Sequence, residues 1–352
     1  MNKRELEAFI KGYGEVPVVY EKDLSGNDYQ DAYLGGGTFN KINFCNANLK
    51  NAFLKECNFV DCDFTGANLD DADLTLASFI NPIGNKISLQ RTIMSYTNFI
   101  DGLFKQADFT QASLTNTNFI NPDLEKACFC QVTSENTCFL NSKLLDADFS
   151  ESKHIRPIFI EPELENIIFS QALLDTAFFS KAVLKNFDFS DMQLLRCQFQ
   201  EADLAQAKFT GLDITQCGFV QANLEEADFS RTIANNCLFI KAKLTGANFS
   251  QAELKQSLFV EAEISRCDFS GAKMEQAQLT EANCEEASFA GAELTYVDFS
   301  HANLNSADLS YSQLYRANLH EISAVETIWR GSTKSAALPT DKKRAQAEQF
   351  QP

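Results

Sequence analysis

Two polar side chains, Ser134 and His154, have residue types that could form a nucleophilic pair. They lie twenty residues apart, and both interrupt a register in which nearly every fifth residue is apolar. A serine beside a histidine is a common arrangement of an activated hydroxyl. The alternative is a hydrogen-bonded polar pair within an apolar stack, with one buried water. We expect the second, because a solid core has no room for a substrate and no oxyanion donor can be identified.

The 11 cysteines offer a second kind of chemistry. Cys197, Cys217 and Cys237 recur every twenty residues, and a ladder of thiolates could hold a soft metal ion. We expect instead that these cysteines are small buried apolar side chains. The odd total and the lack of CxxC or CxxxC pairs argue against a disulfide framework and a zinc site, and favour a reducing compartment.

The two remaining histidines, His301 and His320, stand at variable positions that we expect to face outward as ordinary surface residues. With Ser134 and His154 assigned to the core, the sequence predicts no catalytic residue, no metal ligand and no cofactor-binding residue. The chain is therefore not expected to be an enzyme.

The elements that hold these residues follow from a five-residue period. Each fifth residue from Leu24 to Trp329 is apolar, except Gly84, Ser134 and His154. An α-helix advances about 500° in five residues, and an odd spacing in a flat strand alternates between faces, so neither element can bury this stripe. A chain that turns a corner about every five residues can bury it, and four such sides close a square coil.

A second period of twenty residues supports the four-sided coil. Positions 39, 59, 79 and onward by twenties are Phe without exception as far as Phe259. Segments such as Ala202-Asp203-Leu204 and Ala247-Asn248-Phe249-Ser250 resemble the pentapeptide-repeat family, whose consensus is a small residue, Asp or Asn, and Leu or Phe before two variable positions. The resemblance implies an all-β fold, a right-handed quadrilateral β-helix of about 15 coils, in which the Leu or Phe and the small residue point inward.

The sequence predicts three segments along the chain, because the two open ends of a solenoid must be covered. Leu6, Phe9 and Ile10 indicate a short amphipathic cap, and Trp329 is expected to cover the last coil. Beyond it the register is lost, so the tail is expected to be mobile or to form a short helix. The predicted segments are an N-terminal cap (1–23), a pentapeptide-repeat β-helix (24–331) and a C-terminal tail (332–352).

Charge and hydropathy argue against direct nucleic-acid binding and against a membrane span. The formal net charge is -18, whereas proteins that bind nucleic acid directly use Lys and Arg to neutralise its phosphates. We therefore do not expect this chain to bind nucleic acid directly. No apolar run reaches the length of about 18 residues that spans a bilayer, and the N-terminus lacks the apolar stretch of a secretory signal peptide. We therefore expect a cytoplasmic protein without a membrane span.

One side of the coil carries apolar residues where solvent-facing ones are expected. A stripe of this length exceeds what monomers usually expose, although stacked β-branched residues also simply favour a sheet. The long Leu and Phe side chains in the set favour a contact surface for a partner. We call the set the apolar column, and its members are Val60, Ile80, Ile100, Ile120, Leu140, Ile160, Phe178, Val220, Ile240 and Val260.

Another side carries a carboxylate on every second coil, which could be a row of phosphate mimics. The alternative is structural, because Asp or Asn belongs to the repeat consensus and can satisfy backbone groups at corners. We call this set the acidic row, and its members are Asp108, Asp148, Asp188, Asp228, Asp268 and Asp308.

These surfaces predict a rod-shaped, non-enzymatic scaffold that binds a protein partner, with a homodimer as one option. Similar pentapeptide-repeat proteins occur in bacterial secretion systems, notably type VI. The alternative function is that of an acidic DNA mimic that binds or inhibits a type II topoisomerase (DNA gyrase), as quinolone-resistance members of the family do. The residues alone do not select between these functions.

Overall fold

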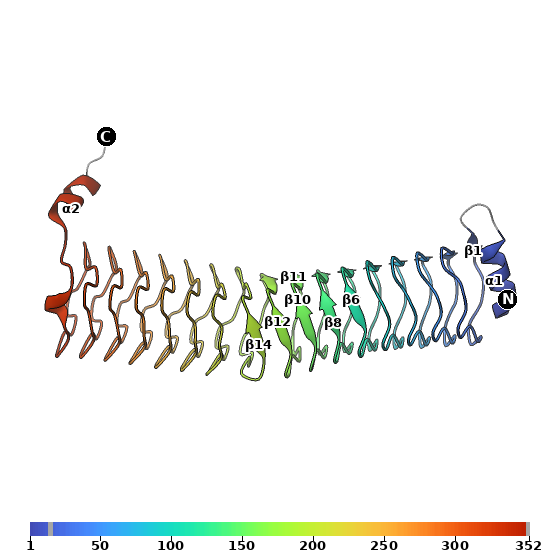
Figure 1. Ribbon diagram of the computed structural model, residues 1–352, viewed down its shortest axis with the longest axis horizontal. Coiled ribbons are helices and arrows are strands. Elements are labelled where there is room, and N and C mark those ends of the chain that lie inside the picture. Colours follow the sequence, from blue (N-terminus) through green and yellow to red (C-terminus); the bar gives the residue numbers. More distant parts are fainter. Residues whose placement is uncertain (13–16, 350–352) are drawn as a thin grey trace. The chain divides into compact units, whose positions relative to one another are not determined.

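The computed structural model describes residues 1–12 and 17–349 (Figure 1). The chain divides into two compact units, Met1–Phe178 and Phe179–Pro352, which we call unit 1 and unit 2. The predicted cap (1–23) and tail (332–352) extend over residues 13–16 and 350–352, which lie outside the described residues.

Both units are built from coils in which each residue pairs in parallel with the residue twenty positions further on. A bridge falls on every fifth residue, so each coil has four sides. This pairing confirms the all-β parallel solenoid and its twenty-residue coil. On the first four sides the partners are Asp23 with Asn43, Asp28 with Asn48, Tyr33 with Phe53 and Thr38 with Asn58.

The corners of the coil use a left-handed backbone conformation that few non-glycine residues adopt. Asn46 and Asn51, for example, have φ values of 54° and 55°. Each of them donates its backbone N–H to the next coil, Asn46 to the Thr65 carbonyl at 2.9 Å and Asn51 to the Asp70 carbonyl at 2.8 Å. The hydrogen bonds between coils thus compensate for the unfavourable backbone angle at each corner.

Regular strands concentrate in unit 1, where they form two parallel sheets (Figure 1). The larger sheet contains, in order, β1 (Val18–Tyr20), β2 (Thr38–Asn40), β3 (Asn58–Val60), β4 (Ser78–Ile80), β5 (Asn98–Ile100), β7 (Asn118–Ile120), β9 (Cys138–Leu140) and β11 (Ile158–Ile160). The second contains β6 (Ser113–Thr115), β8 (Thr133–Glu135), β10 (Lys153–Ile155) and β12 (Leu173–Asp175). The ninth strand of the larger sheet is β13 (Phe178–Ser180), and the remaining strand is β14 (Gln193–Leu195).

The longest sheet has nine strands, fewer than the predicted number of about 15 coils. The difference arises because many sides, including those of most of unit 2, pair through isolated bridges.

The core lies on the coil axis, as the five-residue period predicts. In unit 1 the ring of Phe119 stacks on those of Phe99 and Phe139, with centroids 5.0 and 5.1 Å apart, and meets Phe109 edge-on at 5.7 Å. Stacked and edge-to-face arrangements are the two that aromatic rings favour. Gly84 is the exception: a Cβ there would lie 2.7 Å from the ring of the next coil's Phe104, which occupies the space.

At the N-terminal end, helix α1 (Lys3–Lys11) covers the first coil of unit 1. The Asn2 side chain accepts the Glu5 N–H and the Glu5 side chain accepts the Asn2 N–H, which satisfies two otherwise unpaired donors. Leu6 and Ile10 are buried, and the Tyr29 hydroxyl donates to the Met1 carbonyl at 2.7 Å.

At the other end, the tail of unit 2 contains the short 3-10 helix η1 (Lys334–Ala336) and helix α2 (Lys342–Glu348). Trp329 is half-buried, and the Lys334 ammonium lies 4.0 Å from the centroid of its ring. The β pairing extends from Val18 to Leu338, beyond the predicted limits of 24 and 331. Among the helices that the structure describes, none has both the length and the apolar character to cross a membrane.

Candidate interaction surface

Ser134 and His154 lie in register on β8 and β10, and both point into the core of unit 1. The Ser134 hydroxyl lies 2.6 Å from His154 Nδ1, and His154 Nε2 lies 3.0 Å from the Ser152 hydroxyl. Because Ser152 donates its own proton to the Phe149 carbonyl, its oxygen accepts from Nε2–H. Ser134 therefore donates to an unprotonated Nδ1, and a neutral imidazole satisfies every group.

This geometry favours the structural interpretation of the pair over the nucleophilic one. Burial lowers the pKa of His154 to about 3, which makes its imidazole a weak base. His154 is fully buried and Ser134 is 5% exposed, so no substrate carbonyl can reach the hydroxyl in this conformation. A shallow hollow of about 270 Å³ outside this part of the coil does not include His154; its lining residues are Thr115, Thr133, Ser134, Glu135, Lys153 and Ile155.

The ladder of Cys197, Cys217 and Cys237 is buried within unit 2. Cys237 donates its thiol proton to the Ile214 carbonyl at 3.0 Å, and burial raises its pKa to about 12. The contact with Cys197 and burial together raise the pKa of Cys217. These two groups are therefore thiols at neutral pH, whereas a soft metal ion needs thiolates.

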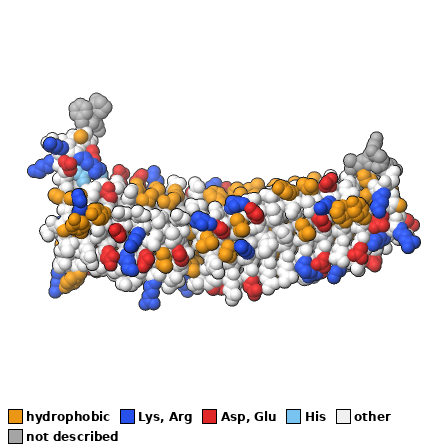
Figure 2. All heavy atoms as spheres, viewed as in Figure 1, with side chains coloured by type: hydrophobic (Ala, Val, Ile, Leu, Met, Phe, Trp, Pro, Cys, Tyr) orange, Lys and Arg blue, Asp and Glu red, His pale blue; other side chains and the backbone are white. Residues whose placement is uncertain are grey.

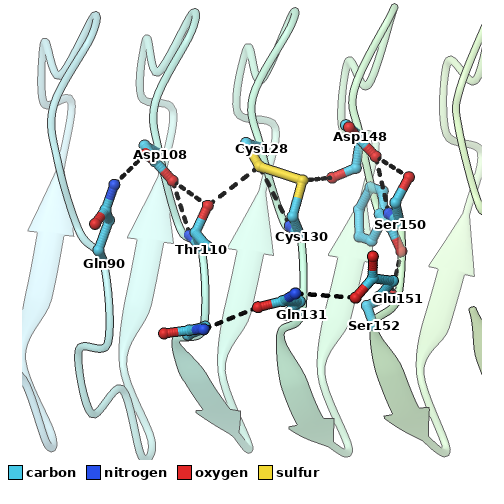
Figure 3. The surroundings of a disulfide bond; sticks show 12 residues. Gln90, Asp108, Thr110, Cys128, Cys130, Gln131, Asp148, Ser150, Glu151 and Ser152 are labelled. Carbon is cyan, nitrogen blue, oxygen red and sulfur yellow. Dashed lines mark hydrogen bonds between the residues drawn. A yellow bond between two sulfur atoms is a disulfide. The ribbon is translucent and has the colours of Figure 1, made fainter.

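Cys128 and Cys130 form a single local disulfide in unit 1, which the expectation that the cysteines form no disulfide framework did not consider (Figure 3). The two residues flank the inward-pointing Phe129, so their side chains leave the coil on the same outer face. Their Cα atoms are 5.4 Å apart, within the usual range for a disulfide. Spacing rules built on CxxC pairs do not detect this CxC pair.

The expectation for His320 is also wrong. His320 is 1% exposed, whereas His301 is exposed as predicted. The imidazole of His320 is covered because Glu348, on the tail helix α2, lies 3.0 Å from its Nε2 atom. The sequence could not reveal this contact, since the twenty-residue pairing ends at Leu338 and the helix that carries Glu348 lies beyond it.

The acidic row uses part of its hydrogen-bonding capacity within the coil (Figure 3). Asp108 Oδ1 accepts the Thr110 N–H at 2.9 Å, and Asp148 Oδ1 accepts the Ser150 N–H at 2.8 Å. The other four aspartates make the same contact two residues further on, at Ser190, Ser230, Ser270 and Ser310. This regular turn contact is the structural role that the repeat consensus implies.

Charge along the acidic row is also broken within unit 2. Lys208 lies between Asp188 and Asp228 and pairs with each through a backbone β-bridge, and its ammonium lies 3.9 Å from the Asp188 carboxylate. Hydrogen bonds from Ser190 hold the pKa of Asp188 below its ordinary value, so this carboxylate is ionised at neutral pH. The row is thus negative but interrupted, in contrast to the uniform charge of a phosphate backbone.

The apolar column forms a continuous ladder in unit 1. The residues that pair in register on adjacent strands of the larger sheet are Val60, Ile80, Ile100, Ile120, Leu140 and Ile160. Figure 2 shows hydrophobic side chains gathered along the edge of unit 1 where Figure 1 places this sheet. Six apolar residues therefore stand side by side on one outer face.

These side chains are half-buried, less exposed than the sequence analysis expects. Each one is covered on two sides by its neighbours in the ladder, which leaves its outer end uncovered. Ile158, on the same face, is 36% exposed. Phe178 in unit 1 and Val220, Ile240 and Val260 in unit 2 are half-buried in the same way.

Beside the column in unit 1 runs a second, polar ladder that the sequence analysis did not single out. Asn98 and Asn118 precede the inward Phe residues of β5 and β7, and the Asn118 side-chain amide donates to Asn98 Oδ1 at 2.9 Å. Asparagine ladders on stacked strands are detectable in the sequence as a twenty-residue repeat. The outer face of this sheet therefore combines an apolar strip with one hydrogen-bonded amide pair.

Comparison with known proteins places these features in context. The chain matches the family described as Pentapeptide repeats, in 8 copies over residues 30–66, 57–82, 97–133, 222–260, 247–283 and 282–320. A search of curated proteins found no match.

The solved structures that are similar to this chain include HetL, QnrB1 and Rfr23. HetL, a pentapeptide repeat protein involved in heterocyst differentiation regulation from the cyanobacterium Nostoc sp. strain PCC 7120, is 21% identical over 73% of this chain and 91% of its own, with a TM-score of 0.32. Full-length QnrB1, a plasmid-mediated fluoroquinolone resistance protein, is 17% identical over 67% of this chain and 95% of its own (TM-score 0.27). Rfr23, a pentapeptide repeat protein from the cyanobacterium Cyanothece 51142, is 20% identical over 43% of this chain and 86% of its own (TM-score 0.15).

Proposed function

We propose, since the chain belongs to the pentapeptide-repeat family, that it is a non-enzymatic scaffold that binds a protein partner through the apolar column of unit 1. The observation that carries this proposal is the unbroken ladder from Val60 to Ile160 on the outer face of one sheet. The interior of the coil is filled by side chains, so recognition falls to the outward positions.

The size of the strip suits a contact with another macromolecule. Six residues on adjacent coils, at a strand spacing of about 4.8 Å, make a strip about 24 Å long. Covering such a strip removes apolar surface from water, which is the main driving force for association. The Asn98 and Asn118 amides beside it supply the polar rim that protein interfaces usually contain.

We further propose that the chain catalyses no reaction. The Ser134–His154 pair supports a structural role, because its imidazole is neutral, buried and satisfied. Neither the residues nor the comparisons favour a type VI secretion system over another assembly. A second copy of this chain remains one of the partners to be tested.

A double substitution in the ladder tests the proposal. Changing Ile120 and Ile160 to Lys should leave the fold intact, since both side chains point outward. It should abolish partner capture or self-association, because a lysine buried without a counter-charge opposes the contact. The measurements are the melting temperature, the mass by light scattering, and the proteins captured from the native host and identified by mass spectrometry.

The matched control places the same charges on other sides of unit 1. Ile93 and Leu103 are 48% and 44% exposed and lie outside the apolar column, so Ile93→Lys with Leu103→Lys should retain mass and partners. If the ladder variant keeps the parent's mass and partners, the apolar column is eliminated as the contact surface. The acidic row then becomes the better candidate, and inhibition of DNA gyrase by the purified chain is the assay for the DNA-mimic alternative.

A further inference from the structure

Three potential metal ligands converge at the C-terminal end of unit 2. His301 and His320 lie on successive coils, and the His301 N–H donates to the His320 carbonyl at 2.9 Å. Glu348, in the last turn of α2, places Oε2 3.0 Å from His320 Nε2 and 3.3 Å from His301 Nε2. The three ligand atoms all lie within 4.8 Å of one another.

We propose that His301, His320 and Glu348 bind a divalent transition-metal ion of the zinc class. The site is independent of the proposed scaffold surface, which lies in unit 1. Two imidazole nitrogens and one carboxylate oxygen are a common protein donor set for zinc, with water as the fourth ligand. Bonds of about 2.0 to 2.1 Å in a tetrahedron separate the donor atoms by about 3.3 Å, close to the two separations that Glu348 Oε2 makes with the histidines.

The Glu348 carboxylate is held in an orientation that suits cation binding. Its Oε2 atom accepts a hydrogen bond from His320 Nε2 at 3.0 Å and lies 3.3 Å from His301 Nε2, so it faces both rings. Arg344 donates to the other oxygen, Oε1, at 2.7 Å, which orients Oε2 toward the histidines. Contacts of this kind beyond the ligands fix the orientation of metal-binding side chains.

Metal binding must also move one proton. The Asp341 N–H donates to His320 Nδ1 at 3.1 Å, so the neutral ring carries its proton on Nε2 and donates it to Glu348. In the metal complex Nε2 binds the ion, the ring proton resides on Nδ1, and the Asp341 N–H turns away. The lost hydrogen bond and the nearby Arg344 charge both reduce affinity, so we expect micromolar rather than nanomolar binding.

Metal binding would hold the tail helix α2 against the coils of unit 2. Helix α2 contains no buried residue among those that the structure describes, so its side-chain contacts with the coils depend strongly on Glu348. A metal ion shared between Glu348 and two coil residues would replace two hydrogen bonds, those of His320 with Glu348 and with Asp341, by three coordinate bonds. The bound ion should therefore hold residues 342–348 against the end of the coils.

Calorimetric titration of the full chain with zinc chloride tests the proposal. The parent should bind one ion, and His301→Ala and Glu348→Gln should each weaken binding at least tenfold, because each removes one ligand. Both side chains are partly exposed, so neither change should unfold the coils. Hydrogen exchange in residues 342–348 should slow when zinc is added to the parent but not to the variants.

The control is Glu326→Gln, which removes an exposed carboxylate from the same end of unit 2 without touching the three ligands. It should bind zinc as the parent does. Cobalt substituted for zinc should give a spectrum without the strong thiolate charge-transfer band that cysteine ligands produce. No binding to the parent, unchanged affinity in His301→Ala and Glu348→Gln, or a thiolate band would overturn the proposal.

Discussion

Replacing Phe199 by Ala is expected to lower the free energy of unfolding by about 3 to 5 kcal/mol. The Phe199 side chain is fully buried in unit 2, and its ring stacks between those of Phe179 and Phe219 at centroid distances of 5.1 and 5.3 Å. The neighbouring coils are held by hydrogen bonds at every corner, so they cannot collapse into the resulting cavity. Urea denaturation followed by circular dichroism measures the loss.

The control for this prediction is Asp188→Asn in the same unit. Asn keeps the side-chain oxygen that accepts the Ser190 N–H, and gives up only a long ion pair with Lys208 in a solvent-exposed position. We expect a change of about 0.5 kcal/mol or less, as for most surface substitutions. Equal losses in the two variants would contradict the assignment of inward and outward positions.

The fold was predictable because one short-range rule repeats without interruption. A residue such as Phe219 points inward for the same local reason as the fifth residue before or after it, and the pairing of Phe39 with Phe59 repeats coil by coil. Each coil contacts only its neighbours, so no long-range choice between topologies arises. The period therefore determines the sheet, the register and the core together.

The exceptions are contacts that the period does not encode. The disulfide depends on two cysteines that happen to flank Phe129, and the burial of His320 depends on a tail helix outside the register. The same limit applies to exposure: the period correctly places Ile120 on an outer face, but its half-burial depends on the size of Ile100 and Leu140 beside it. The repeat pattern determines whether a side chain points inward or outward, whereas the neighbouring side chains determine how much of it remains exposed to solvent.

The candidate surfaces illustrate this division. The sequence predicts two regular sets, the acidic row and the apolar column; in the structure the column is an unbroken ladder from Val60 to Ile160. The sequence leaves open that Asp108 and Asp148 accept hydrogen bonds from their own turns, which reduces their value as phosphate mimics. The apolar column has no comparable internal partner, because hydrocarbon side chains can be satisfied only by burial. This asymmetry is the reason why we favour the column over the row.

Acidification should destabilise the chain through His154. Burial holds the pKa of His154 at about 3 in the folded chain, below the ordinary value of 6.5. Between these values the unfolded chain binds a proton that the folded chain does not, so stability is complete above about pH 6.5 and falls as the pH is lowered. From pH 7 to pH 5 the loss from this one group should be about 2 kcal/mol. Denaturation series at the two pH values measure it.

Other groups also titrate in this range, so the decisive comparison is with Ser134→Leu combined with His154→Leu. The register continues to Leu114 on one side and Leu174 on the other, so the double variant restores a leucine stack. Removing both polar partners avoids leaving either one unsatisfied, whereas His154→Leu alone strands the Ser134 hydroxyl and should cost about 1 to 3 kcal/mol. We expect the double variant to match the parent at pH 7 and to exceed its stability by about 2 kcal/mol at pH 5. An identical pH dependence in parent and double variant would show that His154 is not held neutral in the core.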